Sequence, residues 1–132
     1  MITETAKRKV ALFLKEFYTE ANIGVGGNAP NPNSNNLDVP ILGTNKATVN
    51  SESSELIIDF TATFTGAELN GNTVREFGIF SATTPDDEGF DELRTTTSYS
   101  AETAMLARFA FDALGPFSSS DELEIILTVG VE

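Results

Sequence analysis

Three segments in the second half of the chain alternate apolar and polar side chains with the two-residue period of a β-strand. They span residues 73–80, 104–111 and 122–131, and an earlier segment over residues 55–66 shows the same alternation more clearly. A strand with this period carries its apolar side chains on one face and its polar side chains on the other. Such faces must pack together, so the pattern predicts antiparallel strands around one core.

The first twenty residues follow a different period. Apolar residues recur there at spacings of three and four, which is typical of an amphipathic helix. We expect this helix over residues 3–21, capped by Thr3 or Thr5 and ended by Asn22 and Gly24. The predicted fold class is therefore mainly β, an antiparallel β-sandwich over residues 22–132 preceded by one N-terminal amphipathic α-helix over residues 1–21, in a single domain over residues 1–132.

Turn residues suggest how the strands connect. Asn70-Gly71 lies between two strand patterns, so we expect the strand over 55–66 to pair with the strand over 74–80. Pro40 limits residues 37–42 to an edge strand, because proline has no N–H to donate. The continuous apolar face of residues 123–131 favours the centre of a sheet for the last strand. Residues 26–36 are a loop by composition, and residues 93–99 a strand or extended arm.

The missing residue types argue against catalysis. The 132 residues include no cysteine and no histidine, which removes thiolate metal sites and the usual general base at neutral pH. Acid pairs alone could serve a glycosidase, but no pair stands out and tryptophan is absent. We therefore predict a protein that is not an enzyme and needs no cofactor.

Charge restricts the partners. Eight basic residues against 20 acidic ones give a formal net charge of -12. Such a surface repels phosphate backbones and anionic lipid, and no apolar run approaches the ~20 residues of a membrane span. We expect neither a nucleic-acid nor a membrane partner. The acidic residues of segment 84–92 do not follow the spacing of a calcium loop, so we interpret it as a solvated excursion, with cation binding as the alternative.

A few charged and apolar residues are candidates for contacts between subunits or partners. A charged side chain on a sheet must face water, a partner carboxylate or a neighbouring subunit, and pairing within the chain is the simplest outcome. The helix carries half of the basic residues, and its apolar stripe could cover its own sheet, an acidic neighbour, or both. The candidate contact residues are Val10, Phe13, Leu14, Phe17, Arg75, Glu76 and Arg108.

Taken in order, short motifs span nearly the whole chain. They are Ile23-Gly-Val-Gly26, Asn70-Gly-Asn-Thr-Val-Arg-Glu-Phe-Gly-Ile-Phe80, Met105-Leu-Ala-Arg108 and a hydrophobic final strand. This order resembles a family of small virion structural proteins of tailed bacteriophages and archaeal tailed viruses. The resemblance implies a tail, baseplate, fibre-base or head-surface protein, and it implies that Gly78 allows a close approach to the middle strand.

The resemblance also implies a location and partners. The protein would lie in the virion as a closed homo-oligomer, in contact with other virion proteins and with the host surface as a further candidate. The acidic composition and the 84–92 insertion depart from the family pattern and suggest a salt-loving, archaeal host. The alternative from the residues is a halophilic β-sandwich binding module that recognises a glycan or host receptor through loops 27–36 and 84–92.

The acidity has two explanations that a salt titration separates. Many carboxylates and few lysines keep a protein hydrated in brine, where ions screen their repulsion. If the chain is adapted to salt, its circular dichroism signal should collapse when molar KCl is dialysed away. An ordinary acidic surface predicts a signal that does not change with salt.

Overall fold

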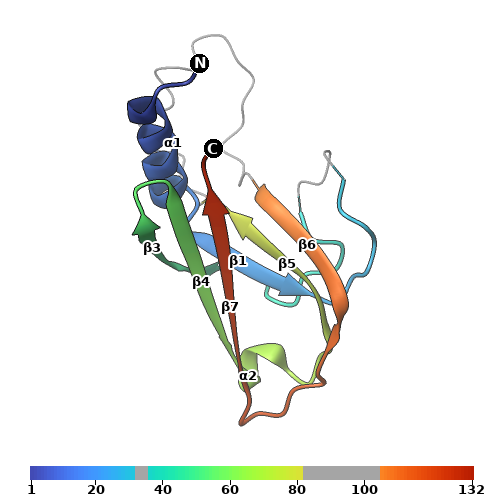
Figure 1. Ribbon diagram of the computed structural model, residues 1–132. Coiled ribbons are helices and arrows are strands. Elements are labelled where there is room, and N and C mark those ends of the chain that lie inside the picture. The colour runs from blue at the N-terminus through green and yellow to red at the C-terminus, as the bar shows by residue number, and fades with distance from the viewer. Residues whose placement is uncertain (32–35, 82–104) are drawn as a thin grey trace.

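The computed structural model describes residues 1–31, 36–81 and 105–132 and shows a mainly β protein with one long helix at its start (Figure 1). Antiparallel sheets follow that helix, as the sequence predicts. The elements are α1 Glu4–Phe17, β1 Glu20–Gly24, β2 Lys46–Ala47, β3 Val49–Ser54, β4 Ile57–Thr65, α2 Gly66–Leu69, β5 Val74–Phe80, β6 Met105–Leu114 and β7 Glu122–Gly130.

The strands form two sheets that face each other. One has the order β2-β1-β5-β6, and the other has the order β3-β4-β7. Burial alternates along β4 as the sequence predicts, because every second side chain points into the space between the sheets. The core between them is built from Ala21, Ile23, Ile58, Phe60, Ala62, Phe64, Leu69, Val74, Phe77 and Ile79.

Helix α1 lies along the sheet that contains β3 and β4 (Figure 1). The Thr3 hydroxyl accepts a hydrogen bond from Ala6 N, which confirms one of the two predicted caps. The helix ends at Phe17, four residues before the expected end, because the chain turns there into β1. Asn50 of β3 fixes this end by donating Nδ2 to the carbonyls of Lys15 and Tyr18, at 2.7 and 2.8 Å.

The expected pairing of β4 with β5 is wrong, since the two strands lie in different sheets. A capping box formed by Thr65 and Glu68 starts the short helix α2 directly after β4. Asn70 then ends it in the left-handed conformation, followed by Gly71 with φ of +71°. The Asn-Gly pair therefore turns the chain from one sheet to the other and does not close a hairpin.

Glu68 has a second partner besides the cap. Its Oε1 lies 2.6 Å from Lys46 Nζ on β2, so α2 is tied to the opposite sheet at this end of the molecule. The hydrogen bond from Lys46, helped by the backbone N–H of Thr65, lowers the pKa of the Glu68 carboxyl.

Two further expectations are also wrong: the central position of the last strand and the edge strand over residues 37–42. Within the described residues β7 pairs only with β4, so it is an edge strand and not the centre of a sheet. Residues 37–42 contribute one isolated bridge, Gly24 to Pro40, in place of an edge strand. The acidic segment 84–92 and the arm 93–99 lie outside the described residues.

Gly66 offers a test of how tightly α2 packs. A Cβ at Gly66 would overlap the backbone carbonyl of Ser118, and backbone cannot move aside like a flexible side chain. We expect Gly66→Ala to lower the free energy of unfolding by about 1–3 kcal/mol, measured by urea denaturation. Gly43→Ala is the matched control, since a Cβ at Gly43 would have no neighbouring atom within 4 Å. Equal stability of both variants would contradict this packing.

Candidate functional site

Helix α1 buries only part of its apolar surface against the chain. Ala11 is buried, and Leu14 and Tyr18 pack against the core. Val10 keeps 47% of its surface exposed, while the rings of Phe13 and Phe17 stack on each other at 5.0 Å between centroids. Among the candidate contact residues, Leu14 therefore serves this chain's own core, whereas Val10 is available at the surface.

Tyr18 closes the aromatic cluster at the end of the helix. Its ring meets both Phe13 and Phe17 edge-on, at 6.2 and 5.0 Å between centroids. Burial in this cluster raises the pKa of the Tyr18 phenol, because removing water disfavours the charged phenolate. The aromatic cluster thus stiffens one end of the helix surface.

The basic residues of α1 are largely used by acids of the same chain. Arg8 lies 3.4 Å from Glu55, and Lys15 lies 3.5 Å from Glu52, both on or beside β3. Lys7 pairs within the helix with Glu4 at 3.6 Å. These pairs are partly exposed, so each contributes little stability, and only the pairs of Arg8 and Lys15 join the helix to the β3 side of the sheet.

The most tightly held group in the described structure is the carboxylate of Glu76 on β5, which is fully buried. Its Oε1 accepts hydrogen bonds from Asp38 N at 2.8 Å and from Arg108 Nε at 3.0 Å. Its Oε2 accepts from Gly26 N and Val39 N, both at 2.9 Å. Two donors per oxygen satisfy the carboxylate, which is what a buried charge requires.

These contacts close the loop that runs from Gly26 to Val39. Gly26 lies where the chain leaves β1, and Asp38 and Val39 lie where it returns. A Cβ at Gly26 would lie 2.6 Å from Glu76 Oε2, and one at Gly24 would overlap the same oxygen. Glycine is needed at both positions because the carboxylate approaches the backbone so closely.

Arg108 on β6 completes this buried cluster. It lies opposite Gly78 on β5, and its Nη2 lies 3.3 Å from Asp38 Oδ2, near enough for an ion pair but not aligned as a hydrogen bond. Leu37 covers the same face of the sheet, with Cδ2 3.0 Å from the position of a Gly78 Cβ. The close approach expected at Gly78 is thus made by side chains.

The candidate contact residues consequently fall into two groups. Glu76 and Arg108 pair inside the chain, which was the simplest outcome for charges on a sheet. Arg75, the neighbour of Glu76, is exposed. The sequence did not single out Gly24, Gly26 or Asp38 as partners of Glu76, although glycines beside a loop are the signal of a close approach.

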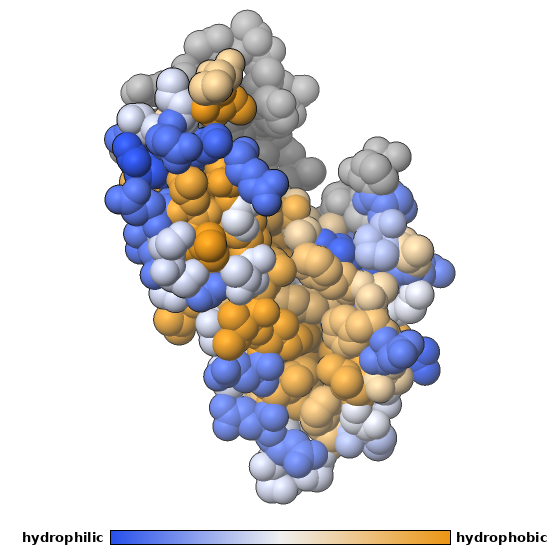
Figure 2. Space-filling view, viewed as in Figure 1, coloured by the Kyte–Doolittle hydropathy of each residue, from blue (hydrophilic) through white to orange (hydrophobic). Residues whose placement is uncertain are grey.

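Among the described residues, the sandwich leaves apolar side chains uncovered on the side of β6 and β7. Phe109 lies opposite the buried Phe77 on β5 and still exposes 42% of its surface. The inward side chains of β7 are only partly buried, although they touch the core. Figure 2 shows the result as an apolar band that runs down this face over β7 and towards β6, separate from the apolar patch on α1.

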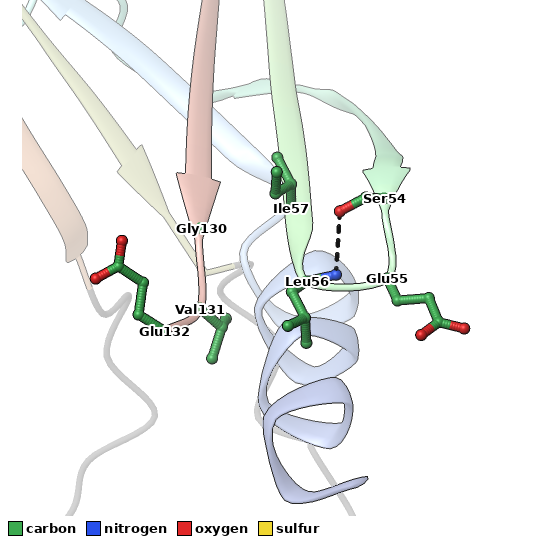
Figure 3. A pocket seen from close by; sticks show the side chains of 7 residues that line it. All are labelled: Ser54, Glu55, Leu56, Ile57, Gly130, Val131 and Glu132. Atoms are coloured by element: carbon green, nitrogen blue, oxygen red, sulfur yellow. Dashed lines mark hydrogen bonds between the residues drawn. The ribbon is translucent and has the colours of Figure 1, made fainter. Parts of the chain in front are cut away.

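A hollow of about 530 Å3 lies where β7 ends beside the β3–β4 connection. Leu56, Ile57 and Val131 form its apolar wall (Figure 3). Its two carboxylates, Glu55 and Glu132, point away from one another and from the apolar side chains. No polar groups converge there, so the hollow lacks the arrangement of a small-molecule site.

The residues that the structure describes contain no group of three or more acidic side chains placed to hold a metal ion. None of the described helices combines the length and the apolar character of a membrane span. No protein-family profile matches the chain, and no curated protein matches it. The described structure supplies the features on which a function can be argued: a buried charge cluster, the exposed Val10 on α1, and exposed apolar side chains on β6 and β7.

The buried cluster predicts a large loss of stability for Glu76→Gln. The amide removes the fully buried charge partner of Arg108, leaving only the partly exposed Asp38, and sets an NH₂ group against backbone donors. Breaking a buried ion pair in this way costs about 3–5 kcal/mol, measurable by urea unfolding. Arg75→Gln is the matched control and should change stability by less than about 0.5 kcal/mol, because that side chain is exposed.

The double variant Glu76→Leu with Arg108→Met distinguishes the stability contributed by the ion pair from the stability contributed by the hydrogen bonds that close the loop. If the charges alone mattered, paired apolar replacements would recover the lost stability. We expect no recovery, because three backbone N–H groups of the loop would still lose their acceptor. Full recovery would contradict the role assigned to the carboxylate.

Proposed function

We propose that the chain is a structural component of a tailed virus particle, at the tail, baseplate, fibre base or head surface, and that it acts through symmetric self-assembly. The observation that supports this proposal is apolar surface left uncovered on two sides of the described structure. Val10 on α1 and Phe109 on β6 are the main examples, at 47% and 42% exposed. A protein that functions by contact needs such surface, and a catalyst does not.

Self-assembly follows from how exposed apolar surface behaves. Contiguous apolar patches on soluble chains mark sites of association, and identical copies can cover them when symmetry closes the assembly. The chain carries a net charge of -12, so copies repel one another at long range. Association must therefore come from short-range apolar contact, and salt should favour it by screening the repulsion.

The buried cluster supports the resemblance to virion proteins in a physical way. The Arg-Glu-x-Gly motif lies on β5 and the Met-Leu-Ala-Arg motif on β6, and these strands are neighbours. Glu76, Gly78 and Arg108 from the two motifs meet in one buried contact. The two motifs thus share one structural role, which is to hold a loop on the outer face of the sheet.

A second candidate function has one supporting observation. Both ends of the loop that begins at Gly26 and returns at Asp38 are fixed by the carboxylate of Glu76. A loop anchored in this way loses less entropy on binding, which suits recognition of a glycan or a host receptor. Specific glycan binding by a monomer would favour this binding module over the assembly component.

The exposed Val10 on α1 provides the test of the first proposal. We expect the purified chain to form a closed oligomer in analytical ultracentrifugation at high salt, and Val10→Asp to weaken it at least about tenfold with no change in melting temperature. Leu12→Asp is the matched control, because Leu12 is also exposed but lies on another side of the helix. A monomer at every salt and protein concentration, absent from purified virus particles, would refute the proposal.

A further inference from the structure

Among the described strands, β7 is the last of its sheet, and its pairing with β4 is regular along its whole length. Nine of its residues pair with β4 without a register shift, from Glu122 with Thr65 to Gly130 with Ile57. No described strand pairs with its other side. Edge strands are normally protected by charged side chains, proline or a bulge. Strand β7 has no proline, lysine or bulge, and its two charged residues, Glu122 and Glu124, both lie in its first three positions. This edge is therefore ready to accept another strand.

One hydrogen bond identifies which backbone groups face outwards. Val131 N donates to Leu56 O at 2.8 Å, and these two residues continue the β4–β7 register. In an antiparallel pair, alternate residues direct both their N–H and C=O groups to the same neighbour. Odd-numbered residues of β7 thus point their backbone groups at β4, and even-numbered residues from Glu122 to Gly130 point theirs at the free edge.

The middle of that edge is apolar on the side that faces away from the core. Ile126 is the central residue of β7 and exposes 56% of its surface. Its neighbours on the same face are Glu124 and Thr128. Protective charge would be expected at this position, so an isoleucine there indicates a contact.

We propose that β7 pairs antiparallel with β7 of a second copy, around a two-fold axis at Ile126. The two three-stranded sheets would then form one continuous sheet of six strands. Ile126 would face Ile126, Glu124 would face Thr128, and Glu122 would face Gly130 of the other copy. All these residues are even-numbered, so each pair brings together the backbone groups that face the free edge.

Charge and side-chain pairing favour this register over its neighbours. A register centred on Glu124 would set two carboxylates directly opposite each other, which is unfavourable in a chain of net charge -12. Centred on Ile126, no like charges meet. On the inner face, Leu123 would lie opposite Val129, and Ile125 opposite Leu127, which would extend the partly buried apolar face across both copies.

This inference deepens the self-assembly proposed above and rests on it only in requiring that copies associate. The two-fold contact at β7 is separate from the contact at α1. Used together, two different contacts can join several copies into one closed assembly.

Single cysteines test the register directly, because the chain has no cysteine of its own. Directly opposed residues of a hydrogen-bonded pair have Cα atoms about 5.5 Å apart, within the range that a disulfide spans. We expect Ile126→Cys to give a dimer of twice 14.2 kDa on mild oxidation. Glu124→Cys and Thr128→Cys should cross-link when mixed and not when oxidised alone.

Val49→Cys is the matched control, since Val49 is exposed on the opposite edge strand of the same sheet. Its cross-linking should remain at the level of random collision. Cross-linking of Glu124→Cys alone, or equal cross-linking of Val49→Cys and Ile126→Cys, would overturn the proposed register.

Ile126→Lys tests the two-fold contact without disulfide cross-linking. Two lysines at the axis would repel, so the dissociation constant of the two-fold contact should rise about tenfold or more at an unchanged melting temperature. A fall in melting temperature without a change in mass would show instead that β7 is covered by another segment of the same chain, and would overturn the proposal.

The outcomes also separate this inference from the proposed function. A dimer that cross-links at Ile126 but is absent from virus particles would keep the β7 contact and refute the virion role. A chain found in particles that never cross-links at Ile126 would keep the virion role and refute the β7 contact.

Discussion

The carboxylate of Glu76 is the constraint on which much of this structure depends. It lies on the face of β5 that points away from the core, where a charge would normally meet water. Here Gly26, Asp38 and Val39 supply three backbone N–H groups, while β6 supplies the guanidinium of Arg108. A buried charge is stable only when it is fully partnered, so this one residue fixes loop and strand together.

The buried cluster also explains why the molecule has surfaces of different character. The loop at Leu37 covers one face of the β2-β1-β5-β6 sheet, and the second sheet covers the other. At the far side β6 and β7 are the last described strands of the two sheets, and Phe109 and Ile126 are left exposed there. The buried charge cluster is thus on one side of the described structure, and the exposed Phe109 and Ile126 are on the other.

Helix α1 adds a second surface of this kind. It is held to the sheet by Asn50, which bonds two carbonyls at the helix end, and by ion pairs to Glu52 and Glu55. Because Ala11 and Leu14 suffice for packing, Val10 remains outside. The helix is thus attached to its sheet by polar groups and by Leu14, and Val10 is exposed in the described structure.

The sequence by itself determined the helical period of α1 and the alternation of β4, which are local properties that neighbouring residues decide. Only the tertiary structure decided which strands are neighbours, that Asn70 leads to the other sheet, that Glu76 finds Arg108, and that β7 is an edge among the described strands. These pairings join residues far apart in the chain, and a local pattern shows that a strand has an apolar face without showing what lies beside it.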